Sequence, residues 1–451
     1  MKIVWIKNPL AIFANGADGG IVIKDKIIIE LVPKNQLPIH PYDEVFDACD
    51  LVVLPGLINT HHHFYQTLTR AYPDALNKEL FPWLKSLYLV WEHLDEEMIY
   101  SSTKLALCEL MLSGCTTASD HHYVFNDAIK NAIDIQMEVA EELGMRVVLT
   151  RGSMSLGVND GGLPPQSVVQ DEQVIIDDSI RLIKKYHNNE FGAMKQIVLA
   201  PCSPFSVSTE LMIESAKVAK DYDICLHTHL AETIDEEDFC ISKFKMRTVD
   251  YLERTNWLHD KTWLAHGIHF NDEEIHRLGN ANVGISHCPT SNMMLASGIC
   301  RTLELEEAGA IVGLAVDGSA SNDGSNMISE TRMAMYLQRL RYGSSKVTHQ
   351  KAIEWGTSGS AQLLRRDDIG EIAVGKCADL AMFSLDEIQF SGSHDPLAAL
   401  LLCGATKATR VMVNGEWKVV EGKMVDIDID AVIKEHKKQA KKLFDKAQKI
   451  K

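Results

Sequence analysis

The sequence predicts an α/β protein built on a (β/α)8 TIM barrel, with a small β domain formed by the N- and C-terminal segments. Two observations predict it. Between about residues 57 and 365, short apolar runs alternate with helical stretches. Before and after that region the pattern is β-rich, with turns between short strands.

The N-terminal segment, residues 1–56, contains the β-rich runs KIVWI, GGIVIKDKIIIELV and DLVVLPG and sustains no helical period. Residues 1–8 (MKIVWIKN) are typical of a strand rather than a signal peptide. They lack a basic start followed by a long apolar run and a small-residue cleavage site.

The middle segment, residues 57–365, is predicted to be the barrel. Between its strands lie helical patterns such as those of residues 98–114 and 126–144. The eight candidate strands are Leu57–His63, Thr116–His122, Arg146–Met154, Gln196–Pro204, Ile224–Glu232, Thr262–Phe270, Val283–Asn292 and Val312–Ser319.

The C-terminal segment becomes β-rich again in residues 370–385 and 410–425, the second run with a hairpin turn at Asn414-Gly415. We expect residues 1–56 and 366–429 to combine into one composite β-sandwich domain. Residues 430–451 form a Lys-rich amphipathic pattern, which predicts a packed terminal helix with a solvated face.

Composition excludes several classes of partner. The formal net charge of −17 argues against a nucleic acid or an acidic membrane surface, and there is no run of about 18 uncharged apolar residues to span a membrane. The ten cysteines are scattered without repeated pairs, which favours a reduced, cytoplasmic chain. We expect a small-molecule partner and a homo-oligomer.

Polar residues follow several of the predicted strands where each apolar run ends. His61 and His63 follow the first strand and share one face of it, because side chains alternate along a strand. His229, His266 and Asp317 end three later runs. Since barrel active sites lie at this end of the strands, and buried charges require a partner or a metal, the pattern predicts a metal site.

Motifs along nearly the whole chain resemble the amidohydrolase superfamily, in the branch of guanine, S-adenosylhomocysteine and triazine deaminases and hydrolases. The motifs are PGLINTHHH, HTHLAE, LAHG, HCPTSN, VDGSASND, GKCADLAMF and VMVNGEW. The resemblance implies that Glu232 shuttles protons and that His266 orients or polarises the attacking water. It implies one metal bound by His61, His63, His229 and Asp317.

Members of this superfamily with two metals use a carboxylated lysine on the fourth strand. Residues 197–204 contain no lysine, so we expect one divalent metal, zinc first and iron second. The implied mechanism has Asp317 as a third catalytic group beside Glu232 and His266. Asp317 takes the water proton and passes it to the leaving amine, while Glu232 protonates a ring nitrogen.

Three residues give weaker indications of the substrate class. Gln66 lies where guanine deaminases carry a glutamine that reads a ring amide. Relatives that act on S-adenosylhomocysteine have a histidine where this chain has Leu199, and their sugar-binding glutamate aligns with Glu92. The missing histidine favours a free base over a nucleoside.

Residues 119–123, 150–156 and 161–170 resemble 8-oxoguanine deaminases and hydroxytriazine ethylaminohydrolases. We therefore expect His122, Tyr123 and Arg151 to face the mouth, with Gln66, His122, Arg151 and Glu232 as substrate contacts. The expected reaction is hydrolytic deamination of 8-oxoguanine, isocytosine or a related base with release of ammonia. The alternatives are a triazine amino- or chlorohydrolase, a guanine deaminase, and, least favoured because the ligand set is complete, a non-catalytic scaffold.

Overall fold

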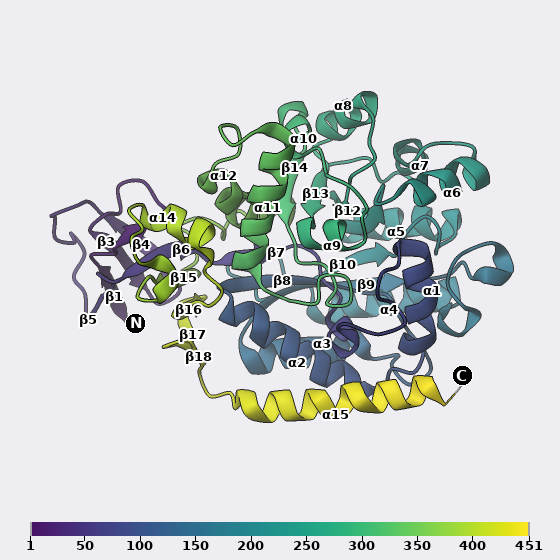
Figure 1. Ribbon diagram of the computed structural model, residues 1–451, viewed down its shortest axis with the longest axis horizontal. Helices are drawn as coiled ribbons and strands as arrows, with labels where there is room; N and C mark the ends of the chain where they lie inside the picture. The colour runs from purple at the N-terminus through teal and green to yellow at the C-terminus, as the bar shows by residue number, and fades with distance from the viewer. Residues whose placement is uncertain (1, 450–451) are drawn as a thin grey trace.

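The computed structural model describes residues 2–449 and contains an eight-stranded parallel sheet whose strands follow in chain order (Figure 1). The sheet closes because the amide of Thr60 donates to the carbonyl of Leu314 at 3.1 Å and that of Asp317 to His61 at 3.2 Å. The predicted barrel is therefore confirmed. Its strands are β7 (Leu57–Asn59), β8 (Cys115–His122), β9 (Arg146–Ser153), β10 (Lys195–Pro201), β11 (Leu226–Leu230), β12 (Thr262–His266), β13 (Gly284–His287) and β14 (Ile311–Leu314).

Several strands end earlier than their apolar runs predict. Strand β12 stops at His266, which has a φ of 74° and turns the chain out of the extended region. Strand β13 stops at His287 because Pro289 begins a helix two residues later. The residues after each strand therefore fold back over the barrel mouth instead of continuing the sheet.

Helices surround the barrel (Figure 1). The predicted helix at 126–144 begins only at Ala132. The α-helices are α1 (Leu80–Trp91), α2 (Glu96–Leu112), α3 (Ala132–Leu143), α4 (Glu172–Tyr186), α5 (Thr209–Tyr222), α6 (Ile234–Phe244), α7 (Thr248–Arg254), α8 (Asp272–Asn280), α9 (Pro289–Met294), α10 (Thr302–Ala308), α11 (Met327–Tyr342), α12 (His349–Glu354), α13 (Ser360–Leu363), α14 (Pro396–Ala399) and α15 (Ile429–Gln448). Short helical turns are η1 (Phe64–Thr69), η2 (Val158–Asp160), η3 (Gln166–Val168), η4 (Trp355–Gly359), η5 (Ile388–Phe390) and η6 (Leu400–Gly404).

Two smaller sheets form the β domain beside the barrel. One has the order β4-β3-β1-β5 and the other β18-β17-β16-β15-β6-β2, so N- and C-terminal strands share a sheet. Leu54 of β6 pairs with Ala381 of β15 in antiparallel register. The strands are β1 (Ile3–Lys7), β2 (Ala11–Ile12), β3 (Gly20–Lys24), β4 (Ile27–Val32), β5 (Glu44–Asp47), β6 (Leu51–Pro55), β15 (Leu380–Ser384), β16 (Arg410–Val413), β17 (Glu416–Val420) and β18 (Lys423–Met424).

The hairpin predicted at Asn414-Gly415 joins β16 and β17, and both turn residues have positive φ, 49° and 83°. The two sheets share an apolar core that includes Ile6, Ile21, Val53, Leu380 and Met412. The unit boundaries predicted from sequence, 1–56 with 366–429, 57–365 and 430–451, remain a prediction.

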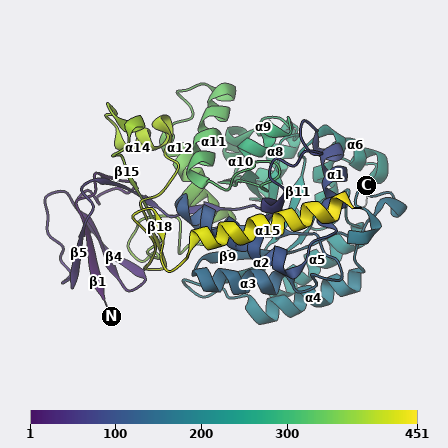
Figure 2. The same cartoon turned by 60° about the horizontal axis from the view of Figure 1, so that its bottom comes forward.

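The C-terminal helix α15 lies across the outside of the barrel against α2, α1 and η1 (Figure 2). The ring of Phe444 packs on Tyr72 with 5.7 Å between centroids, and Lys446 pairs with Asp95 at 2.8 Å. His436 hydrogen-bonds Thr67 at 3.1 Å. The helix therefore supports the turn that follows the first barrel strand. The predicted strand at Met1 and the predicted helix end at 450–451 lie outside the described residues.

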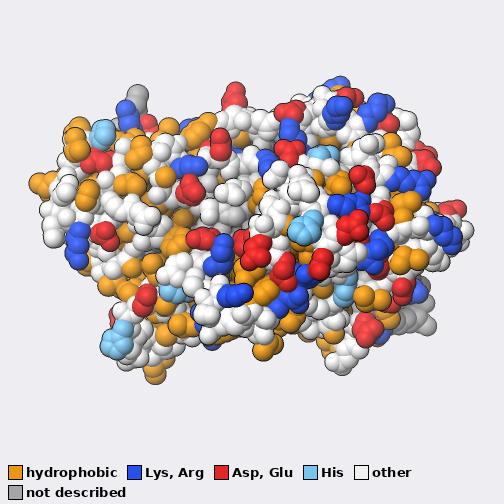
Figure 3. Space-filling view, turned by 90° about the horizontal axis from the view of Figure 1, so that it is seen from above, with side chains coloured by type: hydrophobic (Ala, Val, Ile, Leu, Met, Phe, Trp, Pro, Cys, Tyr) orange, Lys and Arg blue, Asp and Glu red, His pale blue; other side chains and the backbone are white. Residues whose placement is uncertain are grey.

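Acidic and basic side chains intermingle over the face of the molecule seen in Figure 3. Within residues 2–449, none of the helices combines the length and the apolar character needed to cross a membrane.

A buried ion pair joins the barrel to the β domain, and its loss is expected to be costly. Arg146 of β9 pairs with Asp379, and both side chains are almost fully buried. Asp379 also accepts a hydrogen bond from the amide of Asn414 at 2.6 Å. Asp379→Ala leaves Arg146 buried without a counter-charge, so it should lower the free energy of unfolding by about 3–5 kcal/mol in urea titrations.

The matched control for that experiment is Asp127→Ala, which removes an ion pair with Lys130 on the solvent-exposed surface. It should leave the free energy of unfolding close to that of the parent protein, because exposed ion pairs contribute little. Equal losses in the two variants would show that the buried pair does not hold the two units together.

Candidate active site

Four donor atoms converge at the C-terminal end of the barrel. Asp317 Oδ1 lies 3.3 Å from His61 Nε2 and 3.3 Å from His63 Nε2. His229 Nε2 lies 3.2 Å from His63 Nε2. Ligand atoms at 2.0–2.1 Å from a tetrahedral zinc are about 3.3–3.4 Å apart. The spacing of these atoms thus matches the edges of a zinc coordination shell.

Backbone carbonyls fix the tautomers of two of these imidazoles. His63 Nδ1 donates to the carbonyl of His121 at 2.7 Å, and His229 Nδ1 donates to that of Cys202 at 2.7 Å. A neutral imidazole has one donor nitrogen and one acceptor nitrogen. Both Nε2 atoms therefore present lone pairs to the converging donors.

His61 reaches the same state through a second histidine. His227 Nδ1 donates to the carbonyl of Trp263 at 2.9 Å, so its Nε2 is an acceptor. His61 Nδ1 donates to that Nε2 at 2.7 Å, which leaves His61 Nε2 with its lone pair toward Asp317. Burial lowers the pKa of His61 and His227 well below the ordinary value, consistent with neutral rings.

Asp317 follows β14 with a φ of 63°, a left-handed conformation uncommon for aspartate in regular structure. Its second oxygen, Oδ2, accepts from Ser291 at 2.5 Å and from Ser321 at 3.1 Å. Donation from these two hydroxyls stabilises the carboxylate form of Asp317. Asp317 is therefore an anionic donor at the centre of the cluster.

Glu232 and His266 stand beside this cluster. His266 Nε2 lies 3.4 Å from Glu232 Oε2 and 3.9 Å from Asp317 Oδ2, while its Nδ1 hydrogen-bonds Asn292 Oδ1 at 3.0 Å. Burial, assisted by the charge of Asp317, raises the pKa of Glu232 to about 8. A carboxyl group with this pKa is protonated near neutral pH and can act as an acid.

A small cavity of about 30 Å³ opens onto these groups. Helix α1 forms its roof with Leu80, Trp83, Leu84 and Tyr88, and Phe205 and Leu295 add apolar walls. Phe81, on the same helix, packs on Phe205 with 5.0 Å between ring centroids. An apolar enclosure with a few converging polar groups is typical of a small-molecule site.

Gln66, in the turn after His63, lines this cavity and is 1% exposed. Its Oε1 has no hydrogen-bond partner within residues 2–449. A Cβ atom at Gly318 would lie 1.9 Å from that Oε1, so only glycine allows Gln66 to occupy this place. The amide is thus available for a ligand.

The structure corrects the expected orientation of His122 and Arg151. The two residues are register partners in β8 and β9, so they share one face of the sheet, and neither lines the cavity. Arg151 pairs with Asp178 at 2.6 Å and its guanidinium lies 3.9 Å from the ring centroid of Phe125. The face that they share points away from the barrel interior, and we do not retain either residue as a substrate contact.

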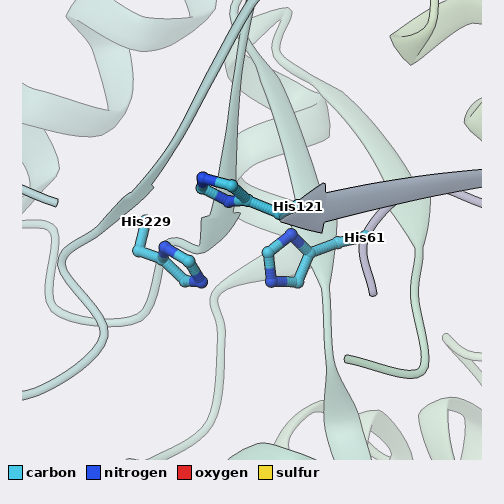
Figure 4. Close-up of side chains that lie close together, drawn as sticks. All are labelled: His61, His121 and His229. Carbon is cyan, nitrogen blue, oxygen red and sulfur yellow. The ribbon is translucent and has the colours of Figure 1, made fainter. Parts of the chain in front are cut away.

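Tyr123, the third residue expected at the mouth, does line the cavity, and so does Cys202. His121, which the sequence analysis did not single out, packs on the ring of His229 with 4.7 Å between centroids. Figure 4 shows the imidazoles of His61, His121 and His229 clustered together. Strand alternation could have identified His121, because alternate residues face the same side of a strand. His121 and Tyr123 therefore share one face, and His122 lies on the other.

Glu92, aligned with a sugar-binding glutamate in nucleoside-processing relatives, also lies outside the cavity lining. It bonds to Ser167 and lies 3.6 Å from His93 at the end of α1. Leu199, on β10, is buried and absent from the lining as well.

Comparison with known proteins places this geometry in a family. The chain is 61% identical to an 8-oxoguanine deaminase of Pseudomonas aeruginosa, over 98% of this chain and 100% of that protein. It is 34% identical to a hydroxydechloroatrazine ethylaminohydrolase of a Pseudomonas species, over 85% of this chain and 82% of the relative.

Among solved structures, the fold matches an atrazine chlorohydrolase of Arthrobacter aurescens in complex with zinc. The TM-score is 0.91 at 28% identity, with 98% of this chain and 100% of the other covered. Residues 52–418 match the amidohydrolase family. The chain belongs to the amidohydrolase family.

Proposed function

We propose that this protein is a metal-dependent aminohydrolase that deaminates 8-oxoguanine to uric acid and ammonia. The observation that supports 8-oxoguanine as the substrate is the 61% identity, over almost the whole chain, to an 8-oxoguanine deaminase. Isocytosine and guanine share the reacting ring, so they are expected to be substrates as well. Their turnover is expected to be poorer than that of 8-oxoguanine.

We further propose that one divalent ion is held by His61, His63, His229 and Asp317. Support comes from the 3.2–3.3 Å spacing of their donor atoms and from hydrogen bonds that direct three lone pairs inward. Zinc is the first choice because imidazole and carboxylate suit it and a structural neighbour contains it; iron is the second.

A cation held by His61, His63, His229 and Asp317 would lower the pKa of the attacking water toward about 7. Around it, the residues divide the proton transfers. Glu232, protonated in its buried setting, donates to the ring nitrogen beside the amine-bearing carbon. Asp317 Oδ2 takes a proton from the attacking water, and His266 Nε2 orients that water from the other side.

The bond changes balance with water as the only co-reactant. A C–O bond forms at the ring carbon, the exocyclic C–N bond breaks, and the proton held by Asp317 leaves with the amine as ammonia. The second proton of the water returns to Glu232 as the ring carbonyl forms. Gln66 fits the lactam edge of the same ring, because a primary amide offers both a donor and an acceptor.

A second candidate is hydrolysis of an amino- or chloro-substituted triazine. The observation in its favour is the likeness to the ethylaminohydrolase and to the chlorohydrolase, both of which act on triazines by name. The metal and acid groups serve either reaction equally, so the substrate has to be tested directly.

Two further properties stay proposals. We propose a reducing, cytoplasmic location, since all ten cysteines are free and none of them forms a disulfide. We also propose a homo-oligomer, which light scattering of the purified protein would test.

The metal assignment predicts a role for His227, which does not touch the proposed metal position. His227→Leu removes the acceptor that fixes the tautomer of His61, and zinc affinity should fall about 10- to 100-fold in competition with a chelator. His227→Gln keeps an acceptor and a donor and should retain most of the affinity. His187→Leu, remote from the cluster, is the control, and equal affinities in all three variants would contradict the tautomer argument.

The acid assignment predicts that Glu232→Gln keeps its zinc but loses about 10²- to 10⁴-fold in kcat. Glu237→Gln is a matched control, because Glu237 is a buried carboxylate of the same segment that pairs with Arg247 at 3.1 Å. Its kcat should stay near that of the parent protein. Near-normal turnover by metal-loaded Glu232→Gln would refute the role.

The substrate assignment is tested by ammonia release from 8-oxoguanine, isocytosine, guanine and hydroxylated or N-alkylated triazines. The highest kcat/KM is expected for 8-oxoguanine. Turnover confined to triazines would replace the leading proposal with the second candidate.

A further inference from the structure

Tyr88 has a hydroxyl with no role in the reaction described above. It lies in the middle of the roof helix α1, lines the cavity and is 1% exposed. Its oxygen has no hydrogen-bond partner within residues 2–449. Buried hydroxyls normally have a partner, since an unmet one loses its hydrogen bonds to water without compensation. An unpartnered hydroxyl facing a small-molecule cavity indicates a partner on the ligand.

The ring of Tyr88 is held in place rather than free to seek another partner. It packs edge-on against Trp91 with 6.0 Å between ring centroids. Trp91 in turn donates from its indole nitrogen to Thr69 at 3.2 Å. This packing restricts the ring of Tyr88 in the cavity wall.

Tyr88 lines the cavity from the roof helix α1. Tyr123 and Cys202, which follow β8 and β10, line it as well. His266 and Asp317 follow β12 and β14, and the strand order places these across the barrel from β8 and β10. A planar base with its reacting carbon at Asp317 therefore extends its remote edge toward Tyr88.

That edge differs between the candidate substrates. In 8-oxoguanine, the remote edge is the five-membered ring, with two N–H donors and one carbonyl acceptor. Isocytosine has only the reacting ring and nothing at this position. A phenol can both donate and accept, so it can pair with either kind of group.

We propose that Tyr88 is a specificity-determining residue, whose hydroxyl hydrogen-bonds the five-membered ring of a bicyclic base. This inference rests on the deaminase function proposed above. It makes Tyr88 a discriminator between bicyclic and monocyclic bases, because an unpaired polar group in the site penalises the ligand that lacks its partner.

Tyr88→Phe tests the inference because it removes one oxygen and keeps the packing. The kcat/KM for 8-oxoguanine should fall about tenfold or more, mainly through KM, while that for isocytosine stays within about twofold. Tyr251→Phe, a buried tyrosine outside the cavity lining, is the matched control and should change neither value. A general loss of structure would lower kcat/KM for both substrates together. An unchanged ratio of the two kcat/KM values would overturn the proposal.

A binding measurement separates this inference from the proposed function. Calorimetry of the zinc-loaded protein with uric acid and with uracil compares a bicyclic and a monocyclic ligand without turnover. Tyr88→Phe should weaken the binding of uric acid and leave the binding of uracil unchanged. If the parent protein deaminates neither base but shows this pattern, the deaminase proposal fails and the role of Tyr88 stands. The proposed role of Tyr88 is overturned if parent and variant bind uric acid equally, or if the protein binds neither ligand.

Discussion

The carboxylate of Asp317 and the three imidazoles around it are the constraint on which the rest of the site depends. A buried carboxylate is costly unless opposite charge and hydrogen bonds compensate for it. Ser291 and Ser321 satisfy Oδ2, while Oδ1 faces two imidazole nitrogens that carry lone pairs instead of hydrogens. Lone pairs that face a carboxylate repel it, so a cation between them would stabilise this arrangement. The electrostatics of the cluster therefore agree with the proposed metal.

Barrel closure supplies that arrangement. The amide of Asp317 donates to the carbonyl of His61, so the hydrogen bond that joins the first and last strands also sets the distance between two proposed ligands. The left-handed backbone of His266 and of Asp317 turns each side chain back over the mouth. A change that loosened the seam would therefore misplace the donor atoms before it unfolded the barrel.

Sequence pattern predicts the barrel and a cluster of polar residues at its mouth, because both depend on local regularities. Apolar runs end where strands end, and alternation places His61 and His63 on one side. Alternation along β8 places His121 and Tyr123 on one face and His122 on the other, so the prediction of His122 at the mouth was wrong. No local pattern could have identified His227 as the partner of His61, since the two are 166 residues apart in sequence.

The roof of the cavity is the feature least accessible to sequence reasoning, and it bears most on the proposed substrate. Whether Tyr88 faces a ligand or the core depends on how α1 packs on the mouth, which a helical period alone does not define. In the structure, α1 is held from outside by α15, whose His436 bonds to the same short turn that carries Gln66. Helix α15 therefore supports both the roof helix α1 and the turn that carries Gln66. Glu92, the residue aligned with a sugar contact, is bonded to Ser167 and does not line the cavity. The position of Glu92 therefore agrees with a free base as the proposed substrate, because the residue that would contact a sugar is engaged elsewhere.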